Sequence, residues 1–391
     1  MKLILNRKSY QTLILSTIPI FILISIDPTF NIQSIVFPII LLVMGEGMFR
    51  EKIQIQKGDI LLISLFVIPM LISFVYNLIF APDNLTSLYF IRIGYTLTVF
   101  LFYFLATSIK LDSREIKYIF IFNIVAGVLV SLYFIFVDPI WYINLLGITI
   151  DKNFTGGILA IQGELAFYLF YYERKKTIKI LYTILFLIIC AGVFYSASRA
   201  AMLVIIGGAL MVIAEDLFFD IKKRNKFFKL ILAGFFLVFV FIFIFPNVTD
   251  YLSANSNLLW YWKRYFVNSY KDGSNASRLA YWKEGIDLWF KKPVFGYGVG
   301  VNVVTKGSAV AHNTFIDYMV DVGLVGLIGF LIICIRSTKT ILFRNGKSFR
   351  ALPVSLFLLC IILSLERSVL LWYTLIIIWL IGNSDFCSVN K

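Results

Sequence analysis

The chain has 391 residues, of which 60% are hydrophobic and 15% are charged, whereas soluble domains are typically about 45–50% apolar and about 25% charged. Apolar runs long enough to cross a bilayer, which takes roughly 17–25 residues, recur along the whole length. This composition excludes a soluble globular fold, because no soluble core could bury so many such runs. The formal net charge of +14 is interpreted as a membrane-topology signal and not as a nucleic-acid-binding surface.

Twelve membrane-spanning helices are predicted from the apolar runs. Their ranges are 10–26, 31–46, 59–80, 88–108, 117–138, 153–172, 177–195, 199–215, 228–246, 313–335, 351–365 and 367–382. The segments predicted to lie inside carry 24 of the 36 Lys and Arg residues, against three in the short outer loops, Lys152, Arg199 and Arg367. Because cytoplasmic loops are enriched in Lys and Arg, both termini are predicted to face the cytoplasm.

The predicted architecture is an all-α polytopic membrane protein in three parts. Residues 1–246 form transmembrane helices one to nine, and residues 312–391 form helices ten to twelve. Residues 247–311, between helices nine and ten, form one long outer-face loop with amphipathic helices. Chemistry on the outer face is therefore expected around this loop.

Two charged side chains lie within predicted spans. Arg92 falls near the outer end of the fourth span, and Glu164 falls near the middle of the sixth. A charge at the bilayer centre costs about 2.5–3.5 kcal/mol, so such residues usually have a partner or line a pathway. Both residues are additional site candidates whose role the sequence leaves open.

Arg199 breaks the positive-inside pattern, and it also opens a predicted helix, where the positive end of the dipole disfavours a cation. These two unfavourable terms suggest a bound anion that offsets both. The preceding Ser198 is a good N-cap, and a helix N-terminus is itself an anion site. The alternative is an arginine that reaches toward lipid headgroups.

Arg278 repeats this arrangement in the outer loop. Ser277 is the expected N-cap of a helix whose apolar stripe contains Leu279, Trp282, Ile286 and Trp289. Such a helix is expected to lie on the membrane or against the bundle. The alternative for Arg278 is a solvated loop charge. The glycine cluster that follows, Gly296-Tyr297-Gly298-Val299-Gly300, is interpreted as a turn that leads the chain back to the bundle.

His312 is the one histidine of the chain. On a continuous helix, His312, Ile316, Met319, Gly323 and Gly326 share one face. The sequence therefore predicts an imidazole at the membrane surface above a smooth groove formed by the two glycines. An imidazole that titrates near neutral pH is a candidate general base.

Other chemistries have less support in the sequence. One histidine and no clustered cysteines argue against a zinc site, and no outward Asp-x-Asp pair offers a cation site for a diphosphate. Arginine guanidinium groups would then have to bind any phosphate. Four of the seven Trp residues, Trp260, Trp262, Trp282 and Trp289, fall in the outer loop. Their faces suit either sugar rings or a membrane-interface belt.

The motifs, taken together, resemble the O-antigen ligase/polymerase superfamily of bacterial membrane glycosyltransferases. The resemblance covers most of the chain and rests on three motifs in order on the outer side. They are Ser198-Arg199-Ala200-Ala201, then Ser277-Arg278-Leu279-Ala280-Tyr281-Trp282 leading to Pro293-Val294-Phe295-Gly296, then His312-Asn313-x9-Gly323-x2-Gly326. The resemblance implies a GT-C-like helical fold in the bacterial inner membrane, with the active site on the periplasmic face.

The resemblance also implies a chemistry. The donor would be an oligosaccharide linked to undecaprenyl diphosphate, with Arg199 and Arg278 on the diphosphate and His312 as the base for the acceptor hydroxyl. Asn313 is a further candidate. Attack at the anomeric carbon would invert it, without a metal or cofactor. Gly323 and Gly326 would leave room for a polyprenyl tail or for tight helix packing.

Three functions stay open at this point. A polymerase would add the glycan to a new repeat unit, and a ligase would transfer it to lipid A-core. The opening of the sixth span, Asp151-Lys152-Asn153-Phe154, resembles polymerases and favours the first. A transporter or flippase would favour internal repeats and broken helices, and neither is evident in the sequence. Other expected partners are membrane lipid and, as an open alternative, a chain-length regulator; no nucleic acid is expected.

Overall fold

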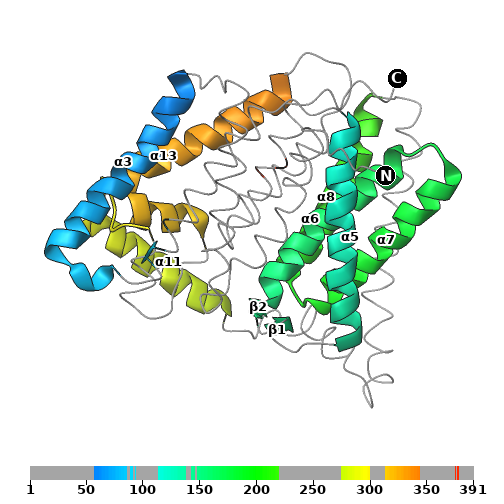
Figure 1. The fold of residues 1–391 in the computed structure, drawn as a ribbon, viewed down its shortest axis with the longest axis horizontal. Helices are drawn as coiled ribbons and strands as arrows, with labels where there is room; N and C mark the ends of the chain where they lie inside the picture. The colour runs from blue at the N-terminus through cyan, green and yellow to red at the C-terminus, as the bar shows by residue number, and fades with distance from the viewer. Residues whose placement is uncertain are drawn as a thin grey trace, which may run out of the picture.

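The computed structural model describes residues 57–85, 89–90, 93, 113–137, 142–145, 148–219, 274–299, 313–343, 375 and 377. Helices dominate this part of the chain (Figure 1). They are α3 Lys57–Phe80, the 3-10 helix η1 Pro82–Asn84, α5 Ser113–Val137, α6 Lys152–Tyr172, α7 Lys176–Tyr195, α8 Arg199–Phe219, α11 Ser274–Lys291 and α13 Thr314–Phe343. Strands β1 Tyr142–Leu145 and β2 Ile148–Asp151 pair antiparallel.

Six of the predicted spans coincide with α3, α5, α6, α7, α8 and α13. Three described helices are long and apolar enough to cross a membrane, Arg114–Phe136, Lys176–Tyr195 and Thr314–Arg336. Shorter apolar helices cover Ser64–Phe80 and Arg199–Ile213. These findings confirm a multi-pass helical membrane protein. The predicted spans 10–26, 31–46, 228–246 and 351–365 lie outside the described residues, as does nearly all of 88–108 and 367–382.

Helix α6 is the centre of a group formed with α5, α7 and α8 (Figure 1). Every residue from position 155 to 166 is buried, so Gln162 and Glu164 face the neighbouring helices and not lipid. Small residues bring the neighbours close. A Cβ on Gly127 of α5 would lie 2.6 Å from Gln162 Oε1, and one on Gly163 would lie 2.5 Å from Ile205 Cδ1 of α8. Close approach at small residues is the usual way in which membrane helices pack.

The start of α5 and the end of α6 are joined by an ion pair. Lys117 Nζ lies 3.1 Å from Glu173 Oε2. Burial alone would raise the pKa of the Glu173 carboxyl, but N–H bonds from Lys175 and Arg174 and the Lys117 ammonium hold this pKa below its usual value. Both residues come from segments that the charge bias predicts on the same side, so the up-and-down order of these two helices agrees with the predicted topology.

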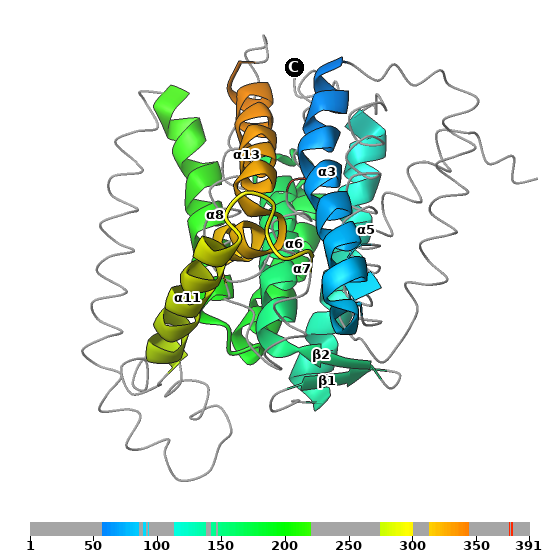
Figure 2. The same cartoon turned by 90° about the vertical axis from the view of Figure 1, so that its left-hand side faces the viewer.

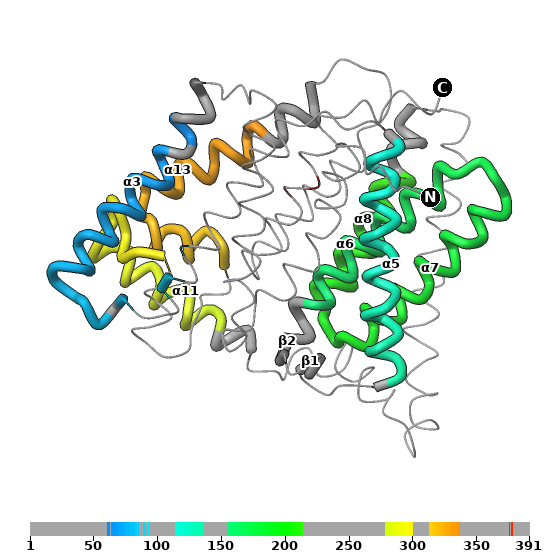
Figure 3. Tube along the Cα trace, viewed as in Figure 1, coloured from blue at the N-terminus to red at the C-terminus, as the bar shows by residue number. Residues whose placement is uncertain are grey.

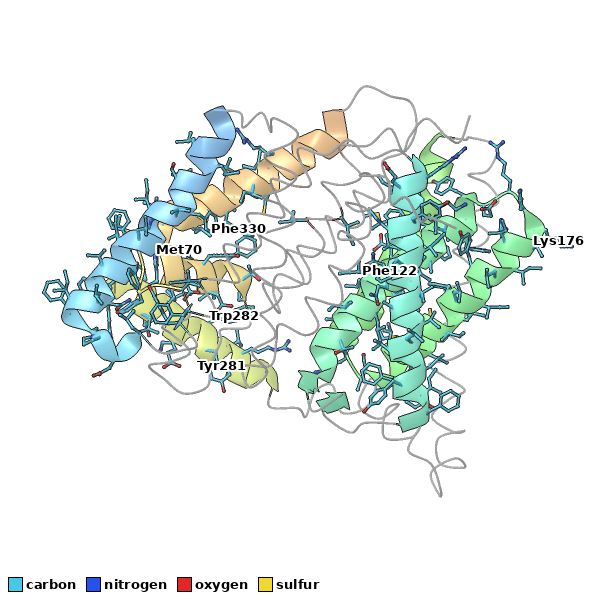
Figure 4. The ribbon with its side chains drawn as sticks, in the orientation of Figure 1. Met70, Phe122, Lys176, Tyr281, Trp282 and Phe330 are labelled. Carbon is cyan, nitrogen blue, oxygen red and sulfur yellow. The ribbon has the colours of Figure 1, made fainter. Side chains whose placement is uncertain are left out.

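A second group is formed by α3, α11 and α13 (Figures 1 and 2). Aromatic rings join α3 to α13: Phe66 meets Tyr318 edge-on at 5.6 Å, and Tyr318 stacks on Phe330 at 4.8 Å. Met70, Phe330 and Trp282, which Figure 4 labels, come from the three helices of this group. The group carries the segment that follows α11 and the start of α13, where the sequence places most of its candidate residues.

Two features of the fold were not predicted. The hairpin β1–β2 lies between the fifth and sixth predicted spans, in a stretch for which no strands were predicted. Helix α13 is broken at Gly323, which has φ 65° and ψ −166°, and the path of α13 changes direction along its length (Figure 3). The expectation that no helix is broken was therefore wrong.

Candidate active site at the ends of α8, α11 and α13

The start of α13 is capped by Asn313. Its Oδ1 accepts hydrogen bonds from the N–H groups of Phe315 at 3.0 Å and Ile316 at 3.4 Å. The side chain is buried, with 7% exposed, and its backbone carbonyl accepts the N–H of Asp317. Asn313 therefore fixes the first turn of α13 as an N-cap does.

The cap corrects the predicted helical face. Helix α13 begins at Thr314, so the face cannot extend back to position 312 as part of this helix. His312 itself lies outside the described residues, directly before the cap in the sequence. The assignment of His312 as general base therefore stays a prediction. It is supported by the fact that His312 directly precedes Asn313, the N-cap of α13, in the sequence.

The break in α13 is filled by residues 293–298, named here the docking segment. Two carbonyls that would normally bond within the helix, those of Val320 and Asp321, accept N–H groups from Tyr297 and Gly298, each at 2.8 Å. In return, two helix N–H groups donate to the docking segment, Leu324 to Pro293 O at 2.8 Å and Val325 to Val294 O at 3.3 Å. The docking segment thus replaces the helix bonds from Leu324 to Val320 and from Val325 to Asp321, and it leaves these four backbone groups satisfied, as a membrane interior requires.

This arrangement contradicts the predicted groove. A Cβ on Gly323 would collide with the Val294 carbonyl and lie 2.6 Å from Phe295 N. A Cβ on Gly326 would meet the side chain of Val322. Gly323 is needed because the chain turns there and the docking segment lies against it, so it offers no room for a polyprenyl tail or a second helix.

We expect Gly323→Ala to lower the free energy of unfolding by about 1–3 kcal/mol, because an L side chain is strained at this φ and ψ. Gly207→Ala is the matched control: Gly207 lies in helix α8, and a Cβ there meets nothing within 4 Å. The measurement is the thermal stability of the two purified variants in detergent. Equal stability of the two variants would contradict the role given to the break.

Helix α11 packs beside the first part of α13. Trp282, Leu288 and Trp289 contact Ile316 and Val320. The end of α11 leads into the docking segment, which bonds to positions 320 and 321, and side chains of α11 also reach back to Ile316, so α11 and the first part of α13 run in the same direction. Their N-terminal turns therefore lie at the same end of the group.

Arg278 lies one turn before Trp282 on α11 and is half-buried. It is therefore placed toward the end of the group where Asn313 caps α13. Two details of the prediction were wrong: α11 begins at Ser274 and not after Ser277, and Leu279 is 62% exposed. The buried face of α11 is the one with Trp282 and Trp289, whereas the apolar side chains of Leu279, Ile286 and Phe290 face outward.

The turn between α7 and α8 carries Arg199. Ser198 is the N-cap of α8, as predicted, because Ser198 Oγ accepts the N–H of Ala201 at 3.3 Å. Ser196 Oγ accepts the N–H of Ser198 and donates to Val193 O at 2.7 Å. Ala197, between the two serines, has φ 56°, a left-handed conformation that costs a non-glycine residue about 1–2 kcal/mol.

The start of α6 packs closely against this turn. A Cβ on Gly156 would collide with Ser196 Oγ and lie 3.0 Å from Ser198 Cβ. Ser196 and Ser198 are both almost fully buried. Strained backbone that is over-determined by its surroundings is typical of functional sites. The strain at Ala197 could not be predicted, because alanine has no preference for this conformation.

The remaining candidates are dispersed. Glu164 is fully buried, and its carboxyl lies against α8, since a Cβ on Gly208 would be 2.7 Å from Glu164 Oε2. Arg92, Trp260 and Trp262 lie outside the described residues. Trp289 donates from Nε1 to Pro293 O at 3.0 Å, so the described tryptophans, Trp282 and Trp289, serve the packing of α11 on α13.

The described structure thus defines a multi-pass helical membrane protein. The N-termini of α8 and α13 are capped by polar side chains, those of Ser198 and Asn313. Residues 184–331 match the family model for O-antigen ligase (Wzy_C), so the chain carries this domain of the membrane O-antigen ligase/polymerase family, which acts in polysaccharide biosynthesis. The match spans Arg199, Arg278 and His312, whereas α3 lies outside it. A search of curated proteins found no match. The family implies transfer of a lipid-linked glycan.

Proposed function

We propose that the protein polymerises a surface polysaccharide by transferring a glycan from undecaprenyl diphosphate to an acceptor repeat unit at the outer face of the inner membrane. The observation that carries this proposal is the bonded unit of α11, docking segment and α13. In support of the proposal, Arg278 stands near the start of α11, and Asn313, which follows His312 in the sequence, caps the start of α13, the helix on which α11 packs. A cation for the diphosphate and a base for the acceptor are the two groups that such a transfer needs.

The proposed reaction is a single displacement. The imidazole of His312 accepts the proton of the acceptor hydroxyl as its oxygen attacks the anomeric carbon from the side opposite the diphosphate. The bond between that carbon and the diphosphate oxygen breaks with its electron pair, which inverts the configuration and releases undecaprenyl diphosphate. Arg199 and Arg278 bind the charge that develops on the leaving group, where fixed cations are most effective. No metal takes part.

A ligase is the second candidate, and the description of the matched family favours it. In that case the acceptor hydroxyl belongs to lipid A-core and the same residues act. A transporter has less support, because the break in α13 is filled by the docking segment and its backbone groups are bonded.

Reconstitution separates the two glycosyltransferases. Purified protein in liposomes is given undecaprenyl-diphosphate-linked repeat units alone, then with lipid A-core, each with and without a chelator. We expect a ladder of longer glycans from the donor alone, unchanged by the chelator. Transfer that needs lipid A-core would show a ligase instead, and loss of the ladder with the chelator would show that a metal takes part. Movement of the donor across the membrane without any elongation would show a transporter.

A further inference from the structure

Two polar side chains of α3 bond to the docking segment. Ser73 Oγ donates to Phe295 O at 3.0 Å, and Asn77 Nδ2 donates to Tyr297 O at 2.9 Å. Ser73 is 3% exposed and Asn77 is fully buried. Both lie one turn apart in a helix that is otherwise strongly apolar. Polar groups inside a membrane span are costly to bury and usually have a function.

The docking segment is therefore bonded on both sides. On one side its N–H groups and carbonyls bond to the broken helix α13, and on the other its carbonyls accept the donors of α3. A third contact comes from Lys292, whose Nζ lies 3.6 Å from the ring centre of Tyr76 on α3 and 4.6 Å from that of Tyr297. Helix α3 thus holds the segment that joins α11 to α13.

We propose that Ser73 and Asn77 are positioning residues for glycan transfer. By fixing the docking segment in the break, they set the direction of the first part of α13 relative to α11. This direction decides how Asn313, the cap of α13, is placed relative to Arg278. The inference rests on the proposed function, because the residues it positions are those proposed to act on the substrate. It extends the site to α3, which lies outside the residues matched to the family.

The main test is Asn77→Leu, which removes the donor and keeps an apolar side chain of similar size. We expect kcat for glycan transfer to fall about tenfold or more with little change in KM for the donor, since small misplacements in an active site can cost up to about 10²-fold. Asn123→Leu is the matched control, because Asn123 is also buried in a span but donates to Ile119 O of its own helix at 2.7 Å. Asn123→Leu should keep kcat.

The second pair of variants is Ser73→Ala and Ser131→Ala. Ser131 is a fully buried serine of α5, and its Oγ has no hydrogen-bond partner among the described residues. We expect a lower kcat only for Ser73→Ala, and a further fall when Ser73→Ala is combined with Asn77→Leu. If the test and control variants lower kcat equally, Ser73 and Asn77 contribute only to the stability of the protein, and the proposal is overturned.

A distance measurement tests the positioning without any substrate. Spin labels at Lys283, which is exposed on α11, and at Met319, which is half-buried in the first part of α13 before the break, report how α11 and this part of α13 lie. We expect a narrow distance distribution in the wild type and in Asn123→Leu, and a broader one in Asn77→Leu. An unchanged distribution in Asn77→Leu would overturn the proposal. If the wild type transfers no glycan, the proposed function fails, and the label distances still decide whether α3 sets the geometry.

Discussion

Replacing His312 by alanine is expected to reduce glycan transfer by about 10²–10⁴-fold, the usual contribution of a general base. The protein should fold normally, because position 312 precedes the cap of α13 and the cap is made by Asn313. The measurement is the initial rate of transfer by purified, reconstituted protein at matched amounts. Full activity of His312→Ala would remove the histidine from the mechanism, whatever the arginines do.

The pH dependence gives a second measurement on the same residue. A base must be neutral to accept a proton, so transfer should fall as the pH drops through the imidazole pKa, ordinarily near 6.5. The fall should be absent from the residual activity of His312→Ala. A flat wild-type profile between about pH 5.5 and 7.5, with the chemical step shown to be rate-limiting, would contradict the base role.

The helix boundaries could be predicted because they depend on local composition. The starts and ends of α6 and α7 fall within one residue of the predicted spans, since apolar runs end where Lys, Arg and turn residues begin. The N-cap at Ser198 followed from the same local reasoning. Such features need no knowledge of what lies next to them in space.

The break in α13 could not be predicted from local sequence. The expected face assumed a continuous helix, and a single Gly323 inside an apolar run is tolerated in many helices. What makes the break stable is the docking segment, which is distant in sequence and supplies the replacement hydrogen bonds. The only local signals were the glycines at 296, 298 and 323, which do adopt positive φ.

The contribution of α3 was missed for a similar reason. Ser73 and Asn77 stand in an apolar run, where two small polar residues do not alter the prediction of a span. Their meaning depends on the carbonyls they contact, and those belong to a segment that was interpreted only as a turn. The sequence therefore predicts the helices well, but not the contacts that join α3, α11 and α13.

Arg199→Ala is expected to lower kcat by about 10²–10³-fold, the typical cost of removing one group that stabilises charge in a transition state. Arg199→Lys should recover part of this loss, since lysine keeps the charge but lacks the planar fork that fits a phosphate. The measurement is single-turnover transfer from the lipid-linked donor, with the rate of release of undecaprenyl diphosphate followed in parallel.

The turn around Arg199 makes this test selective. Its backbone is held by the Ser198 cap, by the bond between Ser196 and Ser198, and by the contact with Gly156. Removing the side chain of Arg199 should therefore leave the strained turn in place while the charge is lost. Arg114→Ala is the control, because Arg114 is an exposed cation near the start of α5, at the opposite end of the predicted spans. If both variants keep wild-type rates, Arg199 serves lipid headgroups and the anion must be bound elsewhere.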